Sequence, residues 1–257
     1  MPRYRLTIEY AGTKYSGWQI QKNARTIQGE LHRAIAGVLG KGPFETYGSG
    51  RTDAGVHALG QVMHLDTAAT LPPATLVARI NEALPAEINV LDAERVPPKF
   101  HARHSAVARS YLYQIARRRS AFAKPFVWWV KEPLDVDRMK DAASRFSGMH
   151  DFQAFSDDDP DEKSTDVLIE DVTLGEDGDL ILVRVGGSHF IWKMVRRMVG
   201  VLVEVGKGSL DPDAIWQVEA APLTAPASGL FLERVFYDGD PRQHPLQAAA
   251  PVRPARG

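Results

Sequence analysis

An arginine and an aspartate stand two residues apart in a segment that otherwise carries few long side chains. The segment reads GSGRTDAGVHALGQV over residues 48–62, and it places Arg51 and Asp53 between three glycines and an alanine. One interpretation is a surface turn with a solvated arginine, because Asp and Gly favour turns. The other is an active loop, in which glycines let a ligand or a second backbone come close to one carboxylate.

The carboxylate of Asp53 could serve as a general base, a metal ligand or a covalent nucleophile. To stay ionised inside a pocket it needs a cation or hydrogen-bond donors that favour its charged form. Arg196 is a candidate partner, because it interrupts the most apolar helical segment of the chain and a buried arginine must be paired. For its neighbours Lys193 and Arg197, a helix rim with snorkelling side chains is an equal alternative.

Nucleic-acid contacts are indicated by aromatic and basic residues in the middle of the chain. Tyr111 and Tyr113 share one face of an expected strand, where the core is the default location, but either ring could stack on a base. A run without acidic residues surrounds them and suggests either a phosphate-docking face or a solvated charged face. Its basic members are Lys99, Arg103, Arg109, Arg117, Arg118 and Arg119.

Several other chemistries are excluded or disfavoured. The chain has no cysteine, which excludes disulfides, thiolate zinc sites and a cysteine nucleophile. A dinucleotide-binding fingerprint fails at Asp53, where a third glycine is needed, and no phosphate-binding lysine loop occurs. The pair His101 and His104 lacks the further ligands of a metal site.

Length and composition fit a globular protein of one large domain or two smaller ones. The chain has 257 residues and a net charge of −1, so it is no general polyanion binder. The N-terminal sequence lacks the apolar core of a signal peptide, and no apolar run approaches the length of a membrane helix. We therefore expect a cytoplasmic protein without membrane association.

Two lobes with the same rhythm of elements are expected, which gives an α+β class with mainly antiparallel sheets and flanking helices. In the first lobe, residues 1–104, residues 4–10 alternate as a half-buried strand and Thr26 caps a helix. In the second, residues 105–239, Asp135 caps a helix, Asp177 and Gly178 mark a hairpin, and residues 189–205 form the most apolar helix. The tail, residues 240–257, is rich in Pro and Ala and is expected to be disordered.

The segment GSGRTDAGVHALGQVMHL resembles the signature loop of the tRNA pseudouridine synthase A family, G-x-G-R-T-D-x-G-V-H. Five further segments resemble the family in the same order along the chain: GTKYSGWQIQKNARTIQGEL, FHARHSAVARSYLY, DFQAFS, FIWKMVRRMVG and GLFL.

The resemblance implies an enzyme that isomerises uridine to pseudouridine at positions 38–40 of the tRNA anticodon stem-loop. It implies no cofactor and no metal, a homodimer, and a fold of two similar lobes around a central cleft. Two rivals stay open: a tRNA-binding module without chemistry, and a glycosidase that releases uracil. The rivals are disfavoured because a pure binder needs no carboxylate in a phosphate-facing site, and glycosidases use a second carboxylate.

The resemblance also implies a role for individual residues. Asp53 is the catalytic aspartate, Tyr111 stacks on the base and is a candidate proton acceptor, Arg196 pairs with the aspartate, and Arg51 helps to displace the flipped nucleotide. The other expected substrate-binding residues are Gly50, Thr52, His57, Arg103, Arg109 and Lys193.

The chain departs from the family pattern at two positions. Ala11 stands where the family usually has Asp, and Arg197 stands where it usually has Asn. We expect Arg197 to add a phosphate contact. The acidic run at residues 157–162 has no assigned role, and one hypothesis is a mobile loop that repels misplaced phosphates.

Overall fold

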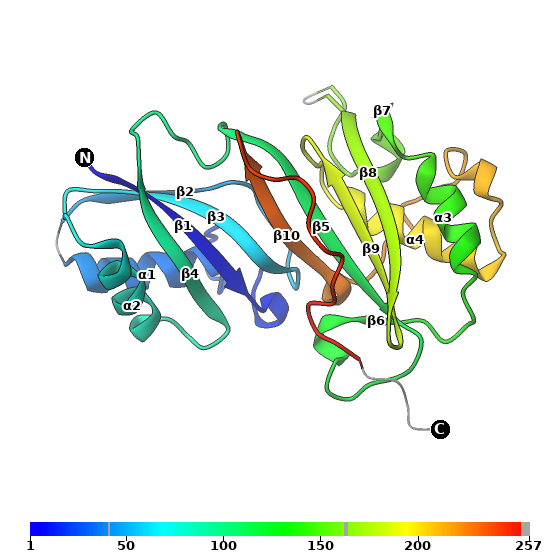
Figure 1. Cartoon of the computed structure of the whole chain (residues 1–257), viewed down its shortest axis with the longest axis horizontal. Helices are drawn as coiled ribbons and strands as arrows, with labels where there is room; N and C mark the ends of the chain where they lie inside the picture. Colours follow the sequence, from blue (N-terminus) through cyan, green and yellow to red (C-terminus); the bar gives the residue numbers. More distant parts are fainter. Residues whose placement is uncertain (41, 162–163, 253–257) are drawn as a thin grey trace. The chain divides into compact units, whose positions relative to one another are not determined.

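The computed structural model describes residues 1–40, 42–161 and 164–252 (Figure 1). The chain forms two compact units. Unit 1 comprises residues 1–107 and 232–241, and unit 2 comprises residues 108–231 and the described part of 242–257. The expected division at residue 104 therefore lies close to the first crossing, but the last strand groups with unit 1 rather than with the second lobe.

Unit 1 is built on an antiparallel sheet in the strand order β4-β1-β3-β10, and β2 pairs with β3 off this path. β1 alternates between buried and half-buried residues, as its sequence predicts, and buries Tyr4, Leu6, Ile8 and Tyr10. The strands are β1 (Arg3–Tyr10), β2 (Phe44–Gly48), β3 (His57–Thr67), β4 (Ile88–Val96) and β10 (Leu230–Tyr237).

Two helices of unit 1 pack against each other and lie behind its sheet in the view of Figure 1. The helix α1 (Ile27–Leu39) is capped by Thr26, whose hydroxyl oxygen accepts a hydrogen bond from the N–H of Gly29. The helix α2 (Pro73–Ala83) begins at a proline, which suits the first turn. The cap at Thr26 confirms the helix start predicted there from sequence.

Unit 2 has the strand order β5-β9-β8-β7, all antiparallel, with the short β6 parallel to β5. The predicted hairpin is confirmed: β8 and β9 are joined at Asp177 and Gly178, where Gly178 has a φ of 58°. The strands are β5 (Ala106–Ala116), β6 (Trp128–Trp129), β7 (Gly148–Asp151), β8 (Asp166–Asp177) and β9 (Leu180–Gly187). The mixed α+β class is confirmed, and β6 and β7 are strands of the second half that the sequence did not predict.

The helices of unit 2, α3 (Val136–Ser144) and α4 (Met194–Lys207), pack against each other. Asp135 caps α3 as predicted, accepting from the N–H groups of residues 137 and 138. The prediction that α4 begins at residue 189 is wrong. Lys193 has a φ of 64°, a left-handed conformation that a helix interior does not accommodate, so the helix begins one residue later.

The tail differs from its expected disorder, because residues 244, 245 and 249 hydrogen-bond to the strands β9 and β5 of unit 2. The guanidinium of Arg184 on β9 donates to the carbonyls of His244 and Pro245, and the side-chain oxygen of Gln114 accepts from the N–H of Ala249. These long-range partners have no signature in the tail's own composition. Residues 253–257 lie outside the described residues. In the described part of the chain, no helix is long and apolar enough to cross a membrane.

Candidate active site

The loop that carries Asp53 joins β2 to β3 and is held at both ends by buried polar groups. At its start, the hydroxyl of Ser49 donates to Gln61 at 2.6 Å, and the Gln61 amide donates to the carbonyl of Gly50 at 3.2 Å. At its end, the ring nitrogen Nδ1 of His57 accepts from the N–H of Gly12 at 3.0 Å. A loop fixed in this way can present a side chain with little cost in conformational entropy.

The middle of the loop is fixed through Thr52. Its hydroxyl lies 2.8 Å from the hydroxyl of buried Tyr10, and its carbonyl accepts from the N–H of Trp18 at 3.0 Å. The backbone of Gly17 passes so close that a Cβ there would lie 2.6 Å from the carbonyl oxygen of Thr52, and Gly17 has a φ of 89°. Only glycine satisfies both conditions without strain.

Asp53 is half-buried, between buried Thr52 and the turn at residues 54 and 55. Its carbonyl accepts from the N–H of Val56 at 3.2 Å, which closes that turn. Arg51 is exposed, and a Cβ at Gly50 would meet no atom within 4 Å among the described residues. The side of the loop at Gly50 is therefore open to a ligand backbone.

Thr52 and His57, expected as substrate-binding residues, are both buried, and His57 is only 1% exposed. Each makes a hydrogen bond that holds the loop in place. Arg103 lies exposed on the segment between β4 and β5. The structure therefore gives Thr52 and His57 a supporting position, and it leaves Arg51 and Arg103 accessible.

In unit 2, β5 separates the two candidate tyrosines. Tyr113 is fully buried and donates its hydroxyl to the carbonyl of Pro226 at 2.7 Å, and burial raises the pKa of its phenol well above the ordinary value. Tyr111 is half-buried, with its ring edge-on to Phe190 at a centroid distance of 5.0 Å. Of the two, Tyr111 is the one whose ring a nucleobase can reach.

Arg196 lies in the first turn of α4 and is half-buried. Its Nε donates to the carbonyl of Ala225 at 2.6 Å, and the N–H of Ala225 donates back to the carbonyl of Arg196 at 3.1 Å. This reciprocal pair fixes the guanidinium from one side. The other expected contact residue in unit 2, Arg109, is half-buried and donates to the carbonyl of Ser188 at 3.0 Å.

Arg197 does not reach solvent, so the expectation that it adds a phosphate contact is wrong. Its side chain is 4% exposed and forms an ion pair with Asp157, which also accepts from Lys193 at 2.5 Å. The backbone N–H of Trp192 donates to Asp158 at 2.9 Å. The hydrogen bond from Lys193, together with the charge of Arg197, lowers the pKa of the Asp157 carboxyl.

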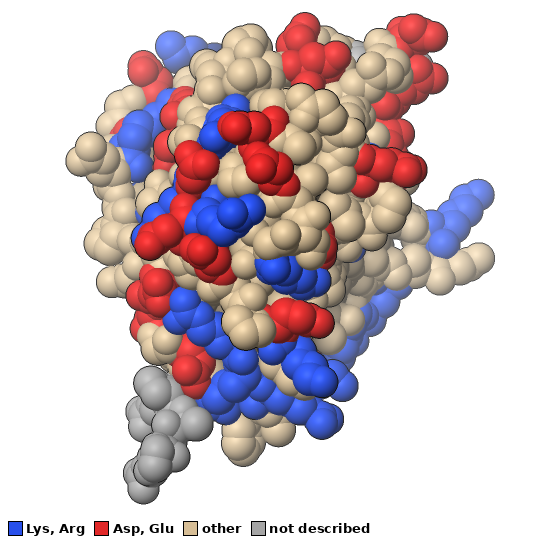
Figure 2. Space-filling view, turned by 90° about the vertical axis from the view of Figure 1, so that its right-hand side faces the viewer, with Lys and Arg blue, Asp and Glu red and all other residues tan. Residues whose placement is uncertain are grey.

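The basic run after β5 is partly neutralised. Arg117 pairs with Glu176 at 2.6 Å and Arg118 pairs with Asp179 at 2.7 Å, and both acids belong to the β8–β9 hairpin. Figure 2 shows Lys and Arg side chains gathered along the lower edge of one face. The segment that follows β5 lies at the same lower end in Figure 1.

No metal site is built from the described residues, since they hold no group of three or more His, Asp and Glu side chains arranged for one. The rings of His101 and His104 lie 4.4 Å apart, and Nδ1 of His101 accepts from the N–H groups of residues 103 and 104. That nitrogen therefore already serves as a hydrogen-bond acceptor for the backbone.

The sequence profile of one family, described as tRNA pseudouridine synthase, matches residues 6–105 and 142–238. The chain belongs to this family. Proteins named tRNA pseudouridine synthase A are similar to it over most of their length. One from Rhodopseudomonas palustris (strain BisA53) is 43% identical and covers 93% of this chain and 100% of its own. One from Geotalea uraniireducens (strain Rf4) is 41% identical, covering 92% and 100%, and one from Maridesulfovibrio salexigens is 38% identical, covering 92% and 91%.

These comparisons confirm the prediction of an isomerase of the tRNA pseudouridine synthase family. A chain in a solved structure of a Cbf5-Nop10-Gar1 complex covers 77% of this chain and 54% of its own length, with 12% identity and a TM-score of 0.34. A likeness at that score carries no argument.

Within this pseudouridine synthase, sequence reasoning missed the role of Asp157. The signal that pointed toward it was a run of acidic residues in a chain with three cations at the start of an apolar helix. Neither the acidic run nor the start of the helix shows in its own sequence that the two lie close together in the fold.

Proposed function

We propose that the protein isomerises uridine to pseudouridine at positions 38–40 of the tRNA anticodon stem-loop, and that Asp53 is its nucleophile. The observation that carries the proposal is the loop itself. It presents one carboxylate at a half-buried position, on a backbone held by Thr52, His57 and Gln61, beside a glycine with open space around it. Membership of the tRNA pseudouridine synthase family gives the substrate class.

The reaction needs little beyond a carboxylate and a support for charge. The bond between uracil N1 and ribose C1′ breaks, the uracil rotates, and a bond from C5 to C1′ forms. C5 loses a proton and N1 gains one, so atoms and electrons balance without a redox cofactor. Asp53 adds to C1′ or to uracil C6, or assists loss of a ribose proton, and all three routes use the ionised carboxylate.

The remaining roles are proposed from the resemblance and from the surroundings of each residue. Arg196 supplies the cation that keeps Asp53 ionised, and its hydrogen bond to the carbonyl of Ala225 holds the guanidinium. Tyr111 stacks on the extruded uracil and is a candidate proton acceptor. Exposed Arg51 fills the space that the flipped nucleotide leaves.

Two other cations and the loop that carries Asp53 are proposed to contact the RNA backbone. Arg103 and Arg109 contact phosphates, and Gly50 lets the RNA approach. Lys193, the third cation expected to bind RNA, is held by Asp157 and is assigned a structural role. Thr52 and His57 act on the RNA through the loop that they hold, since both side chains are buried.

The test of the reaction class is direct. Wild-type protein is incubated with a panel of transcribed tRNAs, pseudouridine is mapped by position, and free uracil is quantified in the same samples. The proposal predicts pseudouridine at positions 38–40 and no free uracil. Tight binding without product would indicate a binding module instead, and release of uracil would indicate a glycosidase.

The proposal includes a homodimer as the working form. Sedimentation velocity over a range of protein concentrations tests this part separately. A mass of twice that of the chain supports it, and a monomer that is active at the same concentration contradicts it.

A further inference from the structure

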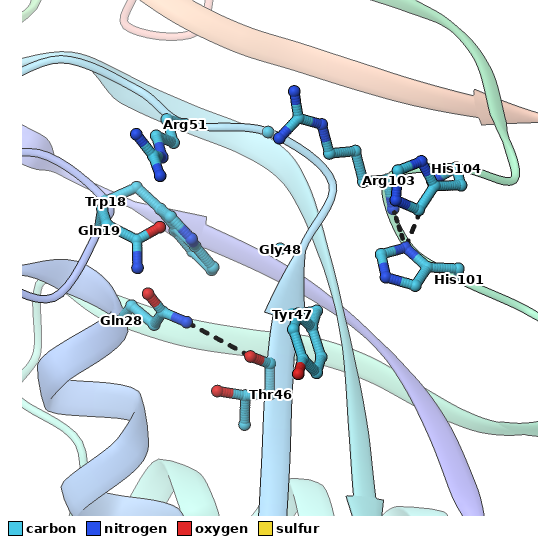
Figure 3. A pocket seen from close by; sticks show the side chains of 11 residues that line it. Trp18, Gln19, Gln28, Thr46, Tyr47, Gly48, Arg51, His101, Arg103 and His104 are labelled. Atoms are coloured by element: carbon cyan, nitrogen blue, oxygen red, sulfur yellow. Dashed lines mark hydrogen bonds between the residues drawn. The ribbon is translucent and has the colours of Figure 1, made fainter.

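A pocket of about 370 Å³ opens in unit 1 beside the loop that carries Asp53 (Figure 3). This volume is near the lower end of the range of about 300–1,000 Å³ that small-molecule pockets span. Its walls come from the segment after β1, from α1, from the end of β2 with the loop that follows, and from residues 101–104. Asp53 is not among the lining residues.

The pocket has an aromatic wall that is supported from behind. Tyr47 on β2 is 47% exposed, and its ring stacks on buried His64 at a centroid distance of 5.1 Å. His101 lies beside both rings, 5.6 Å from Tyr47 and 4.7 Å from His64. A ring packed in this way offers a flat surface that needs no ordering when a ligand stacks on it.

Trp18 completes the aromatic lining. Its ring packs directly on the backbone of Gly48, where a Cβ would lie 2.7 Å from the indole nitrogen. Glycine at the end of β2 therefore allows the indole to lie against the strand.

The polar groups of the pocket are cationic or neutral. The guanidinium groups of Arg51 and Arg103 and the amides of Gln19 and Gln28 line it, and among the described residues no Asp or Glu belongs to the lining. Gln28 is oriented by its own contacts, because its side-chain oxygen accepts from the N–H of Ile20 at 3.3 Å. Flat rings, guanidinium groups and amides without a carboxylate are suited to an anion that carries a heteroaromatic ring.

We propose that this pocket binds the base of a second RNA nucleotide, distinct from the uridine that is isomerised. The base stacks on Tyr47, and an adjoining phosphate lies beside Arg103. The isomerised uridine must reach Asp53, which does not line this pocket, so the two nucleotides occupy different positions. The inference rests on the proposed function in that the ligand is tRNA.

The experiment is a cycle of protein and RNA changes. Anticodon stem-loops with a single abasic position, scanned through the loop, are titrated with wild-type protein, Tyr47→Ala and Tyr47→Phe at one fixed salt concentration. Pseudouridine formation by the wild type on the intact RNA is measured alongside.

A single abasic position other than the isomerised uridine is expected to weaken wild-type binding by about tenfold, the usual effect of losing one base–aromatic stack. Tyr47→Ala should weaken binding of the intact RNA by a similar factor and remove the sensitivity to that abasic position. Tyr47→Phe keeps the ring and should behave as the wild type.

The inference is overturned if Tyr47→Ala binds the intact RNA as the wild type does, as it would if the pocket served a protein ligand. It is also overturned if the effects of Tyr47→Ala and of every abasic position simply add. Wild-type protein that binds the RNA but forms no pseudouridine contradicts the proposed function. The titrations of the Tyr47 variants with the abasic RNAs then still decide whether the pocket binds a base.

Discussion

At the scale of single residues, the account depends on how one carboxylate is held. Thr52 joins Asp53 to the body of unit 1 through the hydroxyl of Tyr10 on one side and the N–H of Trp18 on the other. Both partners belong to elements far from the loop in sequence. A substitution of Thr52 should therefore change how firmly Asp53 is positioned, although the Thr52 side chain does not take part in the reaction.

Replacing Thr52 by Val keeps its shape and removes the hydroxyl. We expect the free energy of unfolding to fall by about 1–2 kcal/mol, because the hydrogen bond between the buried hydroxyls of Thr52 and Tyr10 is lost. The rate of pseudouridine formation should fall while the Kd for tRNA stays the same. Chemical denaturation and single-turnover kinetics measure the two effects.

The matched control is Tyr10→Phe combined with Thr52→Val. The double variant removes both hydroxyls of this hydrogen bond together, so it should regain part of the lost stability. A double variant whose loss equals the sum of the single losses would show that this hydrogen bond does not matter.

At the scale of elements, the start of α4 is determined by the acidic segment before β8. Asp157 holds Lys193, which has a left-handed backbone, and the buried guanidinium of Arg197. Arg196 lies between these two anchored residues. The position of the proposed partner of Asp53 is thus set by a carboxylate that belongs to another segment.

Asp157→Asn should lower the free energy of unfolding by about 2 kcal/mol, since the buried guanidinium of Arg197 loses its counter-charge. We also expect a fall in kcat, because the first turn of α4 is no longer anchored. Asp159→Asn is the matched control, as an exposed acid in the same run. Equal effects of both variants on stability and on kcat would contradict this role of Asp157.

A second prediction at this scale concerns pH. Burial lowers the pKa of His64 to about 4, from an ordinary value of 6.5. Between these two values the unfolded chain takes up a proton that the folded unit does not. Stability is therefore full above pH 6.5 and falls as the pH drops toward 4, by up to about 3 kcal/mol.

Urea denaturation at pH 7 and pH 4.5 measures this loss. The N–H of Ala102 donates to Nδ1 of His64, and an Asn oxygen can replace that acceptor. His64→Asn should therefore have a flatter pH profile than the wild type. The same slope in both proteins would place the titration on other groups.

At the scale of the whole molecule, the net charge does not indicate which cations are available to bind RNA. The chain is nearly neutral, but several of its cations are already paired with acids, such as Arg117 with Glu176 and Arg118 with Asp179. Arg51 and Arg103 line a pocket to which no Asp or Glu of the described residues contributes. The salt dependence of tRNA binding should therefore depend on particular cations rather than on total charge.

Arg103→Ala should reduce the slope of log K against log salt concentration by about 0.7–0.9, the equivalent of one phosphate contact. Arg33→Ala is the control, because Arg33 lies exposed on α1 and pairs with Glu30. Titrations of tRNA at four or five salt concentrations give both slopes. An unchanged slope for Arg103→Ala would remove it from the RNA interface.

Sequence reasoning succeeded where local physics decides the structure. Alternation predicted β1, and cap chemistry predicted the helix starts at Thr26 and Asp135, because each signal lies within a few residues of its effect. It failed at Lys193 and along the tail. There the deciding partners, Asp157 and Arg184, come from segments that are distant in sequence.

The residues of the candidate site also separate into those that a single segment indicates and those whose partners lie in distant segments. The loop sequence made Asp53 a candidate, because it is a carboxylate among glycines, and the resemblance to the family assigned its catalytic role, which stays a prediction. The supporting positions of Thr52 and His57 were not predictable, because their partners Tyr10 and Gly12 lie in another element. The pocket is likewise invisible in sequence, since four separate segments form it.

The most direct test of the central claim is the single-turnover rate of pseudouridine formation by Asp53→Asn, which keeps the shape of the side chain and removes its charge. The account predicts no detectable product from this variant or from Asp53→Ala, with tRNA binding close to that of the wild type. Pseudouridine formed by Asp53→Asn at the wild-type rate would contradict it.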